Sequence, residues 1–383
     1  MLLMQSDVVG TIVWFFMFFI FIFLYPRLML SQMIYKIEQS AAKMERMSDK
    51  ANSMTAKKAG GRDVRKKIDG FTDFFVVEPS AIDPYGLVRK IDQTIRGMET
   101  RFTEFVDEIA PSMDEKEKHE LNYGLRAAIG LRQISKMVRH YVEMAKKFKN
   151  LQIAMILQMQ LPLIEKIAEG ELEGTEAFIN GWPIGDSIGP LVAASYIRNE
   201  KEIGGDIVYG TADIEGRKCF ILKAAGPAPH LGRMDDAIEK LMKKHRIKRV
   251  ITIDAAQKLE GEKTGSVAEG IGFAMGGIAQ REIIENVLLP KKIPVDSIVV
   301  KVGMTEAIMP MKKEIYSSLD GARELVSRAV KRAKKGENVL VIGVGNSCGI
   351  GDNRKEIESV RKAVEMLDKK HKKEKEGKKK GWL

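Results

Sequence analysis

Two aspartates occupy the positions in this chain that are best suited to acid–base chemistry. Asp186 lies in the glycine-rich turn Gly181–Pro190, and Asp254 ends the apolar run that begins at Val250. The first pattern predicts a tight turn that opens a helix, and the second predicts a buried strand. In a parallel sheet both side chains would reach the crevice at the carboxyl ends of the strands, where open α/β folds bind ligands. Two carboxylates that meet there can share a proton and activate water as general base and general acid.

Each aspartate also has a purely structural explanation. Gly185 and Gly189 allow a sharp bend, and Pro190 suits the first turn of a helix, so Asp186 could cap that helix by accepting hydrogen bonds from its free amides. Asp254 could bond to loop amides at the end of its strand. The chemistry therefore depends on whether the two carboxylates come together.

A family resemblance favours such a pair. The turn Gly185–Ala193 resembles the aspartate-containing turn of the bacterial spore germination protease, and it is similar to the acidic turn of hydrogenase maturation endopeptidases. In the germination protease a second acidic residue follows on a strand, in an Ile-Asp-Ala context like that of Ile253–Ala255. The resemblance covers residues 177–310. It implies that Asp186 and Asp254 correspond to the two essential aspartates of a peptidase-like hydrolase.

The resemblance also suggests residues that would contact a substrate. The glycine-rich run 270–277 resembles a loop of the same protease, which would shape a substrate channel beside the turn. The expected substrate-binding residues are Gly185, Ser187, Gly270, Gly272, Gly276 and Asn346. The chain departs from the maturation enzymes at Ile179–Trp182, where their Gly-x-Gly-Asn opening is absent, and His230 lies upstream of Asp254, whereas their nickel-binding histidine lies downstream. No nickel site is expected, and the cofactor is unknown.

A second glycine-rich segment, Val339–Asp352, supports an alternative function. It follows a predicted strand, and Gly343 and Gly345 fit the first part of a Gly-x-Gly-x-x-Gly phosphate loop, although Cys348 takes the place of the third glycine. The alternative is therefore a non-catalytic membrane scaffold whose α/β domain binds a phosphate-bearing small ligand here. If this loop instead lies beside the two aspartates, Asn346 and Asp352 would line the same pocket.

Two further chemistries have weaker support. Cys348 could act as a nucleophile if His230 reached it. Loop carboxylates could bind a metal together with the aspartates, but the chain has no clear ligand spacing, so no metal site is predicted. The carboxylates in question are Glu260, Glu262, Glu269 and Glu306.

The first 30 residues predict a membrane anchor. No charged residue occurs from Val8 to Pro26, and such a run, as a helix, nearly matches the hydrocarbon thickness of a bilayer. Basic residues follow the span and none precedes it, so the body of the protein is expected on the cytoplasmic side of the cell membrane. Two cysteines in 383 residues give no disulfide framework.

The charge distribution indicates which partners to expect. Much of the net charge of +11 lies in the segment after the span and in the tail that follows Leu367. Such runs are usually solvated, and here they could contact anionic lipids. Nucleic acid is not expected because no aromatic residues for base stacking accompany the basic ones.

The remaining organisation follows from periodicity. Apolar residues at heptad spacing from Leu30 to Met54 indicate a stalk helix, either in a parallel homo-oligomeric coiled coil or resting on another element. From 177 onward, short β-rich runs alternate with helical stretches, which predicts an α/β domain with a mostly parallel, phosphorylase/hydrolase-like sheet. The expected strands are 177–180, 206–211, 218–224, 248–254, 297–303 and 338–345.

The predicted architecture therefore has five parts. They are an anchor (1–30), a stalk helix with a basic linker (31–70), an all-α domain (71–175), an α/β domain that holds the site (176–367) and a basic disordered tail (368–383). The chain as a whole looks like an archaeal membrane-anchored family of unknown function.

Overall fold

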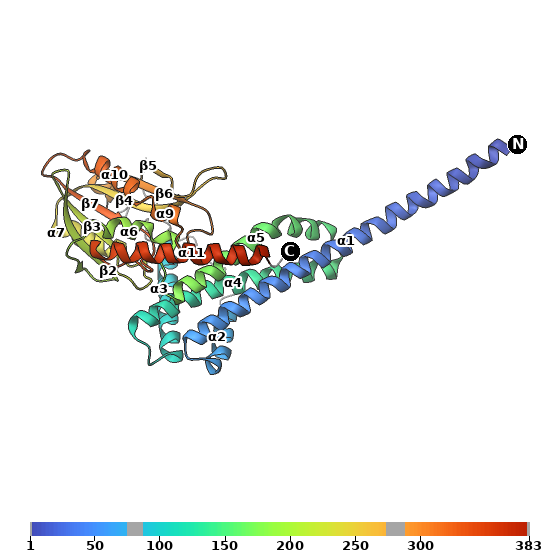
Figure 1. Ribbon diagram of the computed structural model, residues 1–383, viewed down its shortest axis with the longest axis horizontal. Coiled ribbons are helices and arrows are strands. Elements are labelled where there is room, and N and C mark those ends of the chain that lie inside the picture. The colour runs from blue at the N-terminus through green and yellow to red at the C-terminus, as the bar shows by residue number, and fades with distance from the viewer. Residues whose placement is uncertain (1, 75–86, 273–287, 381–383) are drawn as a thin grey trace.

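A computed structural model of the chain describes residues 2–74, 87–272 and 288–380. Figure 1 shows three regions: a long N-terminal helix that projects from the molecule, a group of helices around its second half, and an α/β domain at the far end. The last helix, α11 (Ile357–Lys380), runs from the α/β domain back along the helical region.

Helix α1 (Leu2–Lys58) contains both the predicted anchor and the predicted stalk. The side chains of Ile12–Ile22 and Leu24 are exposed, and within the described residues α1 is the one helix that is long and apolar enough to cross a membrane. Pro26 lies inside the helix, which continues without a break into the helical region.

The heptad face of α1 is buried against helices of the same chain. It packs on α4 (Glu115–Phe148) and α5 (Leu151–Ile179), which form an antiparallel hairpin. Its buried residues in this core are Ile37, Ala41, Met44, Met47 and Ala51. The second interpretation of the heptads, a stalk resting on another element, therefore describes this face, because its apolar side chains are already covered.

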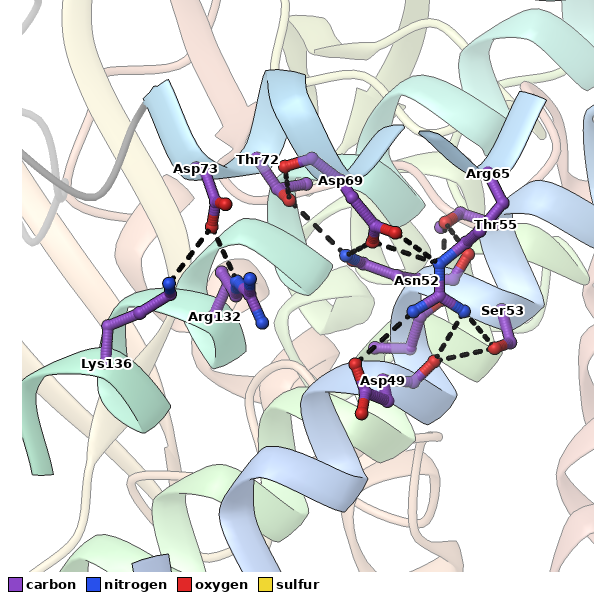
Figure 2. A network of polar contacts seen from close by, with 11 residues as sticks. Asp49, Asn52, Ser53, Thr55, Arg65, Asp69, Thr72, Asp73, Arg132 and Lys136 are labelled. Atoms are coloured by element: carbon purple, nitrogen blue, oxygen red, sulfur yellow. Dashed lines mark hydrogen bonds and ion pairs between the residues drawn. The ribbon is translucent and has the colours of Figure 1, made fainter. Parts of the chain in front are cut away.

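Polar contacts hold α2 (Arg62–Phe74) against the end of α1, as Figure 2 shows. Asn52 donates a 2.7 Å hydrogen bond to Asp69 Oδ1, and Arg65 Nε lies 3.0 Å from both oxygens of that carboxylate. Arg132 of α4 donates a 2.7 Å bond to Asp73. The segment that was expected to be a basic linker is therefore largely a helix, α2, which packs against α1 and α4. Helix α3 (Leu87–Ile109) completes this region.

The α/β domain is built on one seven-stranded sheet, in the order β1-β2-β3-β7-β4-β6-β5. The strands are β1 (Lys201–Glu202), β2 (Ile207–Ile214), β3 (Arg217–Ala224), β4 (Ile247–Gln257), β5 (Val267–Ile271), β6 (Val295–Val302) and β7 (Asn338–Gly343). The four central strands, β3, β7, β4 and β6, are parallel. The pairs β1–β2, β2–β3 and β5–β6 are antiparallel, so the sheet is mixed and the expected mostly parallel sheet is confirmed only for its centre.

Helices cover both faces of the sheet. Apolar residues of α6 (Ile188–Ala194), α9 (Lys313–Tyr316), α10 (Leu319–Val330) and α11 share a core with one face. Helix α7 (Met234–Lys244) packs on the other face. The buried parallel strands explain the uninterrupted apolar runs in the sequence.

Several local predictions are wrong. Residues 177–180, expected to be a strand, form the end of helix α5 and its C-cap Asn180, because a short run of buried apolar residues is equally compatible with a helix. Helix α4 is capped by Asp114, which accepts a 2.8 Å bond from the Glu117 amide. Residues 368–380, expected to be disordered, continue α11. The edge strand β5 was not predicted, since glycine and glutamate dilute its pattern.

Candidate functional site

The turn that carries Asp186 lies against the carboxyl ends of the central strands. Gly189, in the first turn of α6, makes this approach possible: a Cβ atom there would lie 2.5 Å from the carbonyl oxygen of Ile253 and even closer to that of Val344. Gly343, at the end of β7, faces it in the same way, since a Cβ atom there would lie 2.5 Å from Gly189 O. Gly189 and Gly343 therefore allow the backbones of α6, β4 and β7 to come into direct contact.

Asp186 does not cap helix α6. The N-cap residue is Ser187, and the side chain of Asp186 is directed elsewhere: its Oδ2 accepts a 2.7 Å hydrogen bond from the backbone amide of Asn346. The Asp186 amide itself donates a 2.7 Å bond to Ala307 O. The capping explanation that the sequence allowed is wrong, because the carboxylate is used to join two loops.

Asp254 lies inside β4, between β6 and β7, with 5% of its surface exposed. Burial raises the pKa of its carboxyl to about 8, and the nearby charge of Asp186 contributes to the increase. Burial also raises the pKa of Asp186, while the hydrogen bond from the Asn346 amide opposes that shift. The fold therefore brings the two aspartates of the predicted pair within electrostatic range of each other at the carboxyl edge of the sheet.

The electrostatics divide the roles between the two carboxyls. An amide hydrogen bond favours the charged form of each carboxyl, from Asn346 for Asp186 and from Ala255 for Asp254, but only the pKa of Asp254 is raised further by the charge of its neighbour. Asp254, with a pKa of about 8, keeps its proton near neutral pH. Because the charge of Asp186 raises the pKa of Asp254, the pair favours a state with one negative charge and one proton, in which two carboxyls can act as base and acid.

Ser187 and Gly185 hold the turn in place. Ser187 is buried, and its hydroxyl donates a 3.0 Å bond to Cys348 O. A Cβ atom on Gly185 would collide with Glu306 O, so the turn there lies directly on another loop. Both residues lie beside Asp186, as expected, but their contacts in the structure are with the protein itself.

The glycine-rich segment after β7 has already committed its backbone amides. The amides of residues 344 and 346–350 donate to protein acceptors, namely Ile253 O, Asp186 Oδ2, His230 O, Asn346 Oδ1, Pro227 O and Ser347 O. A phosphate loop needs a row of free amides that point at the ligand. Gly343 and Gly345 therefore lie in a loop whose hydrogen bonds support Asp186, an arrangement that gives the phosphate-binding hypothesis little support.

Lys223 and Ser347, which were not predicted to have a role, hold this segment. Lys223 at the end of β3 is completely buried and forms a 2.6 Å ion pair with Asp352, whose Oδ1 also accepts a 2.8 Å bond from the Gly226 amide. The Ser347 hydroxyl bonds to the carbonyl oxygens of Ala225 and Ala228 at 2.5 and 2.8 Å. The feature of the sequence that could have identified Lys223 is its charge inside the otherwise apolar run 219–224.

The second predicted loop is not brought to the aspartates. Gly270 of β5 pairs with Ser297 near the beginning of β6, and the Gly272 amide bonds to Val295 O at 3.1 Å. Because β5 runs antiparallel to β6, both glycines lie toward the amino-terminal edge of the parallel strands, away from the edge reached by Asp186. Gly276 lies outside the described residues.

Cys348 and His230 do not form a nucleophilic pair in the structure. Cys348 is buried, burial raises the pKa of its thiol, and its Sγ donates to Trp182 O at 3.1 Å. His230 contacts other groups: its ring lies 4.1 Å from that of His119, and its Nδ1 lies 3.6 Å from Asp206. A thiol with a raised pKa is a poor nucleophile.

Three of the four loop carboxylates named above have cationic partners. Glu262 pairs with Lys301, Glu269 with Arg328 and Arg332, and Glu306 with Lys312. Among residues 2–74, 87–272 and 288–380, no three histidine, cysteine, aspartate or glutamate side chains converge as metal ligands would.

Two family models match the chain. Residues 11–181 match the "Protein of unknown function (DUF1512) N-terminal domain", and residues 184–351 match the "Domain of unknown function (DUF1512) C-terminal". No curated protein matches. A structure titled "The crystal structure of a protein of unknown function from Corynebacterium glutamicum ATCC 13032" is 16% identical, covers 47% of this chain and 70% of its own, and has a TM-score of 0.22. That score is too low to support an argument about the fold.

Proposed function

This chain belongs to the DUF1512 family, and from that starting point we propose that it is a membrane-anchored hydrolase in which Asp186 and Asp254 activate water. The observation that supports the proposal most is the state of the pair. Asp254 has a pKa of about 8, raised by burial and by the charge of Asp186. Strongly shifted carboxyls that interact with each other are concentrated at catalytic sites.

The mechanism assigns one step to each carboxyl. Asp186, whose charged form the Asn346 amide stabilises against the effect of burial, removes a proton from water as the water attacks a carbonyl carbon. Asp254 donates its proton to the leaving group, so that one bond is hydrolysed and the pair ends with the proton moved from Asp254 to Asp186. Exchange of that proton with solvent restores the starting state.

A peptide is the proposed substrate class, on the strength of the resemblance of the two motifs to the germination protease and the maturation endopeptidases. The scaffold hypothesis remains the alternative. It predicts a protein whose role does not depend on the Asp254 proton.

The proposed location is the cell membrane, with the body on the cytoplasmic side. Helix α1 is long and apolar enough to span, and the nearest charges after the span are Arg27 and Lys36. Retention of positive charge on the cytoplasmic side gives this orientation.

The test is hydrolysis by the full chain, purified in detergent, of a mixed peptide library with the cleavage products read by mass spectrometry. The Asp186→Asn and Asp254→Asn variants are each expected to reduce turnover by about 10²–10⁴-fold, the usual range for loss of an acid or base. Asp235→Asn is the matched control, since Asp235 is another buried aspartate whose pKa burial raises, but it lies on α7, on the opposite face of the sheet.

Three results decide the matter. Loss of cleavage in both site variants, with the control active, supports the pair. Equal cleavage by all four proteins would assign the activity to a contaminant or another site. No cleavage by the wild type, together with normal function of Asp254→Asn in cells, would favour the scaffold.

A further inference from the structure

The turn between α4 and α5 is a rigid tip at one end of the helical region. Helix α4 ends at Phe148, Lys149 turns the chain with a φ of 48°, and Asn150 caps α5 by accepting a 3.2 Å bond from the Ile153 amide. Only two residues separate the helices, so the position of the tip follows from the packing of both helices on α1.

Ion pairs show where this tip lies along α1. Lys58 pairs with Glu120, Glu45 with Arg139 and Glu38 with Lys146. The order shows that α4 runs antiparallel to α1, toward its apolar end, as Figure 1 also shows. At about 1.5 Å per residue, Glu38 lies roughly 18 Å beyond Pro26, and the turn at Lys149 lies about one helical turn nearer to the apolar run.

That position is close to the headgroup layer of a membrane crossed by the apolar run. The polar layer on each side of the hydrocarbon core is roughly 5–8 Å thick. The residues of α1 that separate the run from the tip include Leu28, Leu30, Met33 and Ile34, which are themselves apolar. Lysine and phenylalanine side chains at the tip are long enough to reach toward that layer.

The tip exposes the types of side chain that bind such a layer. Phe148 and Ile156 are 61% and 62% exposed, and the Lys147 ammonium lies 5.5 Å from the Phe148 ring. Within the described part of the chain, no ion pair joins Lys147, Lys149 or the nearby Lys36 to a carboxylate, whereas Lys146 is paired with Glu38 and Glu143. Exposed apolar groups surrounded by unpaired lysines are typical of contacts with anionic membrane surfaces.

We propose that the α4–α5 tip, with Phe148, Lys147 and Lys149, docks on the anionic headgroup layer of the membrane that α1 crosses. The inference rests on the membrane anchoring proposed above and adds a second contact to it. This contact fixes the tilt of α1 and holds the α/β domain at a set distance from the membrane.

A lipid surface fits this tip better than a second copy of the chain does. The tip lies at the end of the helical region that is nearest the span of the same continuous helix, and a lysine cluster would repel an identical cluster on another copy. The heptad face of α1, which the sequence suggested could associate with other copies, is already covered by α4 and α5.

The experiment places a fluorescent label at Phe148→Cys in the full chain. Cys219 and Cys348 are both buried, so the introduced cysteine is the reactive one. The protein is reconstituted into vesicles with and without anionic lipid, and flotation first establishes that it is bound. Quenching by nitroxides on the lipid chains and by aqueous iodide is then compared with a label at Met366→Cys, a 53% exposed residue on α11.

We expect lipid nitroxides to quench the label at position 148 at least twofold more than the label at 366, and iodide to quench it less. The difference should be larger in anionic vesicles and should decrease with Lys147→Glu and Lys149→Glu. Ile156→Cys provides a second position if Phe148→Cys does not fold.

Different outcomes separate the two proposals. Failure to float would refute the membrane anchor itself. Flotation with equal quenching at 148 and 366 would refute the tip contact alone. Shielding at 148 that persists in detergent, together with energy transfer between labelled copies, would identify a second copy of the chain as the occupant and overturn the inference.

Discussion

The backbone amide of Asn346 donates a 2.7 Å hydrogen bond to Oδ2 of Asp186, and this bond joins the loop after β7 to the turn that opens α6. The loop residue between β7 and Asn346 that makes the contact possible is Gly345, which has a φ of +119° and would bring a Cβ atom within 3.1 Å of the same carboxylate oxygen. The bond stabilises the charged form of Asp186 and partly offsets the effect of burial on its pKa.

The raised pKa of Asp254 predicts a pH-dependent stability. Its ordinary value is 3.8 and its value in the folded chain is about 8, so the folded state binds the proton more tightly than the unfolded state. The contribution is therefore full below about pH 4, decreases as the pH rises and is lost above about pH 8. Asp254→Asn should raise the Tm above pH 8 by several degrees and have less effect at pH 5. Thermal unfolding in detergent measures it, with exposed Asp320→Asn as the control; equal changes at both pH values would contradict the assignment.

The pair also predicts a coupling between the two sites. Since the charge of Asp186 contributes to the raised pKa of Asp254, Asp186→Asn should lower the Asp254 pKa while burial keeps it above 3.8. Infrared titration of the carboxyl band, with Asp254→Asn used to identify it, measures the value. An unchanged Asp254 pKa in the Asp186→Asn protein would show that the carboxyls do not interact.

Gly189→Ala should severely destabilise the α/β domain. The added methyl group would collide with the carbonyl oxygens of Val344 and Ile253, which are backbone atoms that cannot rotate away. We expect a loss of at least about 3 kcal/mol, in the range of severe overpacking. Gly321→Ala is the control, because its Cβ atom would meet Val267 at an ordinary 3.4 Å and alanine favours helix α10 by about 1 kcal/mol. Denaturant unfolding compares them, and a mild effect at Gly189 would mean that α6 does not approach β7 so closely.

Removing Asp352 should destabilise the loop after β7. Asp352→Ala leaves the completely buried Lys223 without its 2.6 Å ionic partner, which usually costs about 3–5 kcal/mol. The double variant with Lys223→Met should recover much of the stability, because no buried charge remains. Glu215→Ala, which removes the partner of the exposed Lys331, should cost less than about 1 kcal/mol. A double variant that is less stable than Asp352→Ala would refute this account.

Glu171 in α5 should destabilise the helical region at high pH. Burial raises its pKa to about 7, and the carboxylate lies so close to Gly130 of α4 that a Cβ atom there would be 3.2 Å from Oε2. Because the folded pKa is raised, the stability that the carboxyl provides below about pH 4.5 is lost as the pH rises through 7. Glu171→Gln should therefore raise the Tm at pH 8 more than at pH 5, by a few degrees. Glu169→Gln, on the exposed side of the same helix, is the control.

The sequence by itself determined the elements that local pattern can specify. The apolar run of α1 can be recognised directly in the sequence. The strands β2, β3, β4, β6 and β7 each coincide with a short apolar run. The same patterns located Asp186 in a glycine turn and Asp254 in a strand. These inferences succeed because burial requires apolar residues at a fixed spacing, whatever the chain packs against.

Only the tertiary structure determined which residues and elements contact one another. The heptads of α1 showed that one face must be buried, but an apolar face can be covered equally well by a second copy or by α4 and α5. The antiparallel direction of β5 sent Gly270 and Gly272 toward the edge opposite the aspartates. The Asn346 bond to Asp186 and the Lys223 pair with Asp352 join residues more than 100 positions apart. Side chains at such separations leave no periodic trace, because their contacts depend on the order and direction of the strands between them.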